Sequence, residues 1–161
     1  MKHTVAVLVE NNPGVLAKVA NLFSRRGYNI DSLVVSDTED KSISRMTIVV
    51  EGDEKTVEQV TKQLHKLVDV IKVNDLTHDD IVSRQLLLVR VAADRETRGE
   101  IIQLMDIFRA RIIDIGRRYL IIEATGDESK IEAILKSLQP FGIQEIVKTG
   151  ISAMVRGPKE K

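Results

Sequence analysis

The sequence contains no cysteine, which excludes disulfide bonds, thiolate metal sites and a cysteine nucleophile. Only 3% of the residues are aromatic, too few for the stacked rings with which RNA-binding sheets hold bases. The 24 basic residues balance 24 acidic ones, so the chain has no net field to hold a polyanion. We therefore expect no nucleic-acid partner.

Long apolar runs are also missing. The first run, within MKHTVAVLVENN, is too short for the apolar core of a signal peptide, and no later run reaches the length that spans a membrane. We therefore expect a soluble, cytoplasmic protein with no membrane partner.

Groups that could carry catalysis are few. The three histidines, His3, His65 and His78, are scattered, and none has an evident nucleophile or carboxylate partner. Neither a Gly-x-Gly-x-x-Gly nor a Walker sequence is present. We predict that the chain is not an enzyme, with no catalytic residue, no metal site and no cofactor of its own.

The chain does contain a clear alternation of strand and helix patterns. Its first half predicts strands at 4–10, 29–36, 42–50 and 70–75, with helical periodicity after the first and the third. Gly27 is expected to end the first helix and Asp53 to cap the second. One face of strand 42–50 should be buried, because Met46, Ile48 and Val50 alternate with Arg45, Thr47 and Val49. The order of elements is βαββαβ.

The second half repeats this order, with strands at 84–93, 111–116, 118–125 and 143–155 and helices at 94–110 and 127–139. GDEKTVEQVTKQL (52–64) also aligns without gaps on GDESKIEAILKSL (126–138), which indicates a duplication. We predict an α+β fold of two ferredoxin-like domains, 1–76 and 84–161, joined by a polar linker at 77–83.

The turn after the first strand is a candidate binding site. Pro13 suits the first helical position and Asn12 the N-cap. Gly14 leaves the helix N-terminus open, where N–H groups and the helix dipole attract an anion. The side chain of Asn11 is expected to be free to accept from an ammonium or to donate to a carboxylate. These residues would serve equally as an ordinary turn and helix start, so the residues alone leave the question open.

Resemblance to a family bears on that question. Asn11-x-Pro13-Gly14-Val15-Leu16 on a βαββαβ frame resembles the turn of ACT domains, the amino-acid-sensing modules of biosynthetic enzymes. The likeness continues through FSRRGYNIDSL (23–33), SRMTIVVEGDE (44–54) and QVTKQLHKLVDVIKV (59–73). These segments are similar to the small, regulatory subunit of acetolactate synthase (acetohydroxyacid synthase).

The resemblance implies a non-catalytic regulatory subunit. It would bind and activate a large catalytic subunit carrying thiamine diphosphate, Mg²⁺ and FAD, and would confer feedback inhibition by valine in branched-chain amino-acid biosynthesis. It also implies a homodimer with the effector held between the first turn of one protomer and the second strand of the other. On this sequence, the effector-binding residues would be Asn11, Gly14, Val15, Leu16, Asn29 and Ile30. Valine, leucine and isoleucine are not distinguished, because a pocket separates them by only about 1–3 kcal/mol.

The second half lacks this turn signature. Its first strand is followed by DRETRGE, without Pro-Gly, so no effector site is carried onto it. Arginine is frequent there, and the two interpretations are a solvated face or a surface that docks the catalytic subunit. The arginines that carry this observation are Arg84, Arg90, Arg95, Arg98, Arg109, Arg111, Arg117 and Arg118.

Two other functions remain open from the sequence. A free-standing ACT-type sensor could regulate another enzyme or a transcription factor. A small enzyme on the same fold, such as an acylphosphatase-like hydrolase, would need an arginine in its first loop, and this loop has none.

Overall fold

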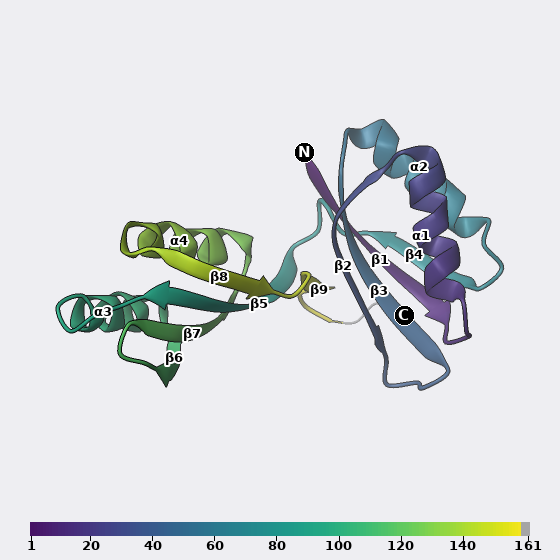
Figure 1. Ribbon diagram of the computed structural model, residues 1–161. Helices are drawn as coiled ribbons and strands as arrows, with labels where there is room; N and C mark the ends of the chain where they lie inside the picture. Colours follow the sequence, from purple (N-terminus) through teal and green to yellow (C-terminus); the bar gives the residue numbers. More distant parts are fainter. Residues whose placement is uncertain (159–161) are drawn as a thin grey trace. The chain divides into compact units, whose positions relative to one another are not determined.

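The computed structural model describes residues 1–158 and divides them into two compact units. Unit 1 contains Met1–Val82 together with the described residues from Ile151 onward, and unit 2 contains Ser83–Gly150. Each unit is described by itself below (Figure 1).

Unit 1 has the predicted βαββαβ order and a four-stranded antiparallel sheet in the order β2-β3-β1-β4. Figure 1 shows both of its helices on one face of this sheet. Its elements are β1 (Lys2–Glu10), α1 (Val15–Arg26), β2 (Asn29–Asp37), β3 (Ile43–Glu51), α2 (Glu54–His65) and β4 (Val70–Asp75).

The core of unit 1 follows from the two periodicities of the sequence. Alternate residues of β1 and β3 point toward the helices, and every third or fourth residue of each helix points back. The resulting buried cluster consists of Val5, Val7, Val9, Val15, Val19, Phe23, Met46, Ile48, Val50, Val60 and Leu64. As predicted, Gly27 ends α1 at a left-handed φ of 68°, and the side chain of Asp53 caps α2 by accepting from the Thr56 N–H.

The central part of the opposite face of the unit 1 sheet is also buried, which corrects the expectation of one buried face. Thr47 and Val49 are only 3% and 2% exposed. Leu76 and Ala153 pack on Ala6 of β1 there. The alternation in β3 could not reveal this cover, because it comes from segments remote in the sequence.

Unit 2 has a sheet in the order β6-β7-β5-β8 and a core shared with two helices. Its elements are β5 (Ile81–Ala92), α3 (Arg98–Phe108), β6 (Arg111–Ile115), β7 (Tyr119–Gly126), α4 (Glu128–Leu138), the short 3₁₀ helix η1 (Gln139–Phe141) and β8 (Ile143–Lys148). Two ferredoxin-like units with antiparallel sheets confirm the predicted fold class.

The last predicted strand, 143–155, is wrong as a single element. It divides into β8 and β9 (Ser152–Val155), with 149–151 between them. The interruption has a physical cause, because Ile151 is buried in unit 1 and its N–H donates to the Ser32 hydroxyl at 2.8 Å. The chain therefore returns to unit 1, whereas the sequence placed 84–161 in one domain. The expected linker is also partly strand, since β5 begins at Ile81.

Candidate functional site

The turn between β1 and α1 is fixed to the sheet by its neighbours. The Glu10 N–H donates to Asp69 O at 2.8 Å, and the Asn11 N–H donates to Ser42 O at 2.8 Å. Three loops, those after β1, before β3 and before β4, therefore meet at one end of the unit 1 sheet.

The helix cap differs from the prediction. Gly14 is the N-cap, with φ 84° in the left-handed region and no side-chain cap, and α1 begins at Val15. The predicted roles of Asn12 and Pro13 as N-cap and first helical residue are therefore wrong. The Asn12 Nδ2 donates instead to the Glu10 and Asp69 carboxylates, at 3.0 and 3.4 Å. An amide NH₂ has two N–H donors, so it can donate to both carboxylates at once, and the contact with Asp69 is not revealed by residue types in the turn alone.

The start of α1 presents backbone donors. Within residues 1–158, no backbone hydrogen bond is made by the N–H of Gly14, Leu16 or Ala17, and Gly14 has open space where a Cβ would be. Unpaired N–H groups at a helix N-terminus carry the positive end of the helix dipole. The turn can therefore accept a carboxylate.

An ion pair behind the turn was missed by the sequence reasoning. Lys18 Nζ lies 2.9 Å from an Asp69 oxygen, and the Asp69 side chain is only 12% exposed. The hydrogen bond from Lys18, followed by that from Asn12, lowers the pKa of Asp69 below its usual value. Lys18 and Asp69 are far apart in the sequence, and only the fold shows that β4 begins beside the start of α1. The pair neutralises a buried carboxylate next to the open N–H groups of the turn.

The remaining residues of the turn that were predicted to bind the effector differ in their hydrogen bonding and in their exposure. The Asn11 side chain is not free, since its Nδ2 donates to Lys41 O at 3.0 Å, which leaves its oxygen as an acceptor. Val15 is 4% exposed and lies in the core, so its side chain offers no surface to a ligand. Leu16 is 45% exposed and is the apolar side chain that the turn presents to solvent.

Asn29 and Ile30 lie at the other end of the sheet. Asn29 and Lys2 are both registered with Glu51 of β3, whereas Glu10 is registered with Ile43. At about 3.4 Å per residue, this places Asn29 roughly 27 Å from the end of β1. One chain therefore does not bring the two predicted walls together, and a pocket made from both requires a second copy.

The histidines remain apart from this turn. His3 is buried with Nε2 2.9 Å from Gly52 O, and His78 has a partner that the sequence did not reveal, the exposed Glu54 carboxylate at 3.2 Å. Across the described part of the chain, no group of three metal-ligating side chains is found. No helix in that part is long and apolar enough to cross a bilayer.

The βαββαβ unit, with open backbone N–H groups at its first turn, has the architecture of an ACT-type module, and a second ferredoxin-like unit follows it. Comparison with known sequences agrees. Residues 5–72 match the family described as AHAS small subunit-like ACT domain, and residues 84–157 match the family described as small subunit of acetolactate synthase.

Individual relatives extend over the whole chain. A protein of Archaeoglobus fulgidus named "Probable acetolactate synthase small subunit" is 59% identical over 99% of this chain and 100% of its own length. The acetolactate synthase small subunit of Mycobacterium leprae is 56% identical over 98% of this chain and 93% of its own. The crystal structure of the small subunit from Thermotoga maritima superposes with a TM-score of 0.88, at 47% identity and 99% coverage of both chains. The chain belongs to the acetolactate synthase small subunit family.

Proposed function

We propose that this chain is the non-catalytic regulatory subunit of an acetolactate synthase. It activates a large catalytic subunit, which holds thiamine diphosphate, Mg²⁺ and FAD, and it makes that enzyme sensitive to valine. The observation that carries the effector site is the start of α1. There the N–H groups of Gly14, Leu16 and Ala17 make no backbone hydrogen bond within residues 1–158, and Leu16 lies exposed beside them.

The sheet topology supports a homodimer as the form that completes the site. β2 is an edge strand, and Asp37 at its end is registered with Ser44, as is Val9 near the end of β1. If two copies pair antiparallel through β2, the Asn29 end of one strand lies beside the Asp37 end of the other. Asn29 and Ile30 of the second copy then lie at the end of the sheet that carries the Gly14 turn.

Binding follows from the chemistry of these groups. The amides at the α1 start take the carboxylate of the amino acid, the Asn11 and Asn29 oxygens take its ammonium, and Leu16 and Ile30 contact its branched side chain. Burial of that side chain contributes about 1.5–3 kcal/mol, so sub-millimolar affinity also requires paired charged ends.

The test is reconstitution with the catalytic subunit. Acetolactate formation should rise when the chain is added and fall as valine is titrated, and a pull-down should recover both subunits. If the chain neither activates the enzyme nor makes it respond to valine, the proposal is wrong.

Substitution of Gly14 tests the turn itself. Gly14→Asp places a carboxylate at the anion site and should abolish valine inhibition while activation persists. Gly14→Asn is the matched control, because both residues tolerate a left-handed φ and only one is charged. Asn29→Ala should weaken valine binding without loss of activation. Unchanged valine binding by Gly14→Asp in calorimetry would show that the effector binds elsewhere.

A further inference from the structure

The ion pair between Lys18 and Asp69 lies beside the turn that is proposed above to hold the effector. Lys18 Nζ is 2.9 Å from Asp69 Oδ2, and Asn12 Nδ2 is 3.4 Å from Asp69 Oδ1. Asn12 comes two residues before Gly14 in the chain, and the Lys18 N–H donates to Gly14 O at 3.1 Å. The Asp69 carboxylate therefore contacts the chain on both sides of Gly14 and its open N–H group.

The backbone also holds Asp69 at this turn. Its carbonyl accepts from the Glu10 N–H at 2.8 Å, at the point where β1 ends. Asp69 is 9% exposed, whereas its neighbour Val68 is 94% exposed, so the chain directs the aspartate inward and the valine outward. The fold therefore places a carboxylate at the turn, and its charge has to be compensated there.

Two carboxylates lie at this turn, and they differ in exposure. Glu10 is exposed, so water and salt screen its charge. The Asp69 side chain is only 12% exposed, and a charge withdrawn from water acts more strongly on its neighbours. Lys18 is the only ion-pair partner of Asp69 within residues 1–158. The charge of Asp69 is therefore balanced by this one lysine.

Without Lys18, the Asp69 charge would act against an effector carboxylate. The open N–H groups and the positive end of the α1 dipole attract an anion. A fixed negative charge beside them opposes that attraction, and it does so more strongly where water is excluded. The ion pair removes this opposition and leaves the turn with the positive field of its backbone donors.

We propose that Lys18 is a positioning residue that sets the affinity of the first turn for its effector by neutralising Asp69. The lysine acts through the aspartate and does not itself contact the effector. This role rests on the proposed function, because it concerns the amino-acid site at Gly14. Effector affinity then depends on the charge balance of the pair: loss of the cation weakens binding, and loss of the anion does not.

The test is a set of charge variants of the full chain, with L-valine binding measured by calorimetry at neutral pH. Lys18→Met removes the cation and leaves the Asp69 charge, and it should weaken valine binding about tenfold. Lys18→Arg keeps the charge and should keep most of the affinity. Asp69→Asn removes the anion and keeps an acceptor for Asn12, so it should bind valine at least as tightly as the unchanged chain.

A double variant separates the effect of charge from that of structure. Lys18→Met combined with Asp69→Asn carries neither charge, and it should recover most of the affinity that Lys18→Met loses. If the pair served only to hold the turn in shape, each single change would break the same contact and both would lose affinity. Lys62→Met is the matched control, because it removes an exposed ion pair with Glu58 within α2, and it should leave valine binding unchanged.

Four results would overturn the proposal. These are full affinity in Lys18→Met, a loss in Asp69→Asn comparable with that in Lys18→Met, no recovery in the double variant, or an equal loss in Lys62→Met. Any of them, with valine still bound by the unchanged chain, removes the role of the pair and leaves the proposed effector site standing. If the unchanged chain binds none of valine, leucine and isoleucine, the effector site itself is wrong, and the role of Lys18 with it. Circular dichroism, thermal melting and sedimentation of each variant distinguish a loss of binding from a loss of folding or of association.

Discussion

The corresponding ends of the two sheets share the same backbone hydrogen bonds but carry different side chains. In unit 1 the Glu10 N–H reaches Asp69 O and the Asn11 N–H reaches Ser42 O, and in unit 2 the Ala92 N–H reaches Gly142 O and the Ala93 N–H reaches Arg118 O. These backbone bonds correspond one to one. The side chains do not, because unit 1 places the Lys18–Asp69 ion pair there and unit 2 has Gly142 where unit 1 has Asp69.

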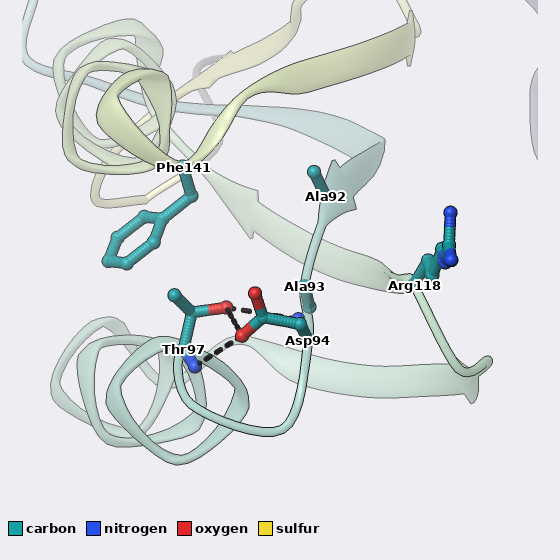
Figure 2. Close-up of a pocket in the computed structure, with 6 residues that line it drawn as sticks. All are labelled: Ala92, Ala93, Asp94, Thr97, Arg118 and Phe141. Carbon is teal, nitrogen blue, oxygen red and sulfur yellow. Dashed lines mark hydrogen bonds between the residues drawn. The ribbon is translucent and has the colours of Figure 1, made fainter.

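This difference shows that the backbone fold, here called the frame, and the side chains that could bind a ligand vary independently. The repeated backbone bonds follow from the βαββαβ order, which many unrelated functions share. What each end presents depends on a few residues: open amides at Gly14 in unit 1, and in unit 2 a hollow lined by Asp94, Thr97 and Phe141 (Figure 2). The outer sheet faces differ too, since Thr47 and Val49 of β3 are buried, whereas Glu123 and Thr125 at the corresponding positions of β7 are half-buried and exposed.

The largest expected effect comes from matched core substitutions. Leu64 of α2 and Leu138 of α4 occupy the same position of the internal repeat, and both are 0% exposed. Leu64→Ala and Leu138→Ala should each destabilise by about 2–5 kcal/mol, because each leaves a cavity in a packed core. Urea unfolding gives the loss, and hydrogen exchange should show it confined to the unit that carries the change. Equal loss of protection in both units would mean that they unfold as one.

The next largest effect concerns Ala153, which helps to bury the outer face of the unit 1 sheet. Ala153 is 7% exposed and packs on Ala6 and Leu76. Ala153→Asp should cost about 1–3 kcal/mol, the loss being limited because β9 can detach and leave the helix-side core intact. Val147→Asp, on an exposed position of β8, is the control and should change stability by about 0.5 kcal/mol or less. Rapid exchange restricted to 151–155 in Ala153→Asp would support this account, and collapse of the whole unit would contradict it.

The frame was more predictable from the sequence than these differences. Strands and helices repeat local periodicities, so the order in both halves and the caps at Gly27 and Asp53 followed from the residues themselves. The partner of Asn12, the cover at Ala153 and the hollow at Phe141 depend on residues far apart in the chain. Gly14 was singled out correctly as an open position but not as the cap, because the contact of Asn12 with Asp69 depends on a residue far along the chain.

A pH titration should detect the Asp69 carboxylate of unit 1, which has no counterpart in unit 2, where Gly142 occupies the matching position. The pKa of Asp69 is lowered in the folded chain, chiefly by Lys18, so its contribution to stability is present above the usual value of 3.8 and is lost as the pH falls through the lower, folded pKa. Carboxyl NMR shifts of Asp69 give that pKa. Lys18→Met should raise it toward 3.8, and Lys62→Met, which removes an exposed pair with Glu58, should not. An unchanged Asp69 pKa in Lys18→Met would mean that the ion pair is absent in solution.

The smallest expected effect tests whether the two repeated helix caps contribute equally to stability. Asp53 and Asp127 cap α2 and α4 alike, accepting from the Thr56 N–H at 2.8 Å and the Lys130 N–H at 2.9 Å. Asp53→Ala and Asp127→Ala should each lower the melting temperature of their own unit by a few degrees and by similar amounts, because each leaves the same helix donor without its acceptor. Asp53→Asn and Asp127→Asn keep an acceptor and should lose less. A clear inequality between the two alanine variants, measured by hydrogen exchange of α2 and α4, would show that the surroundings of each helix, rather than the shared cap, determine how firmly it begins.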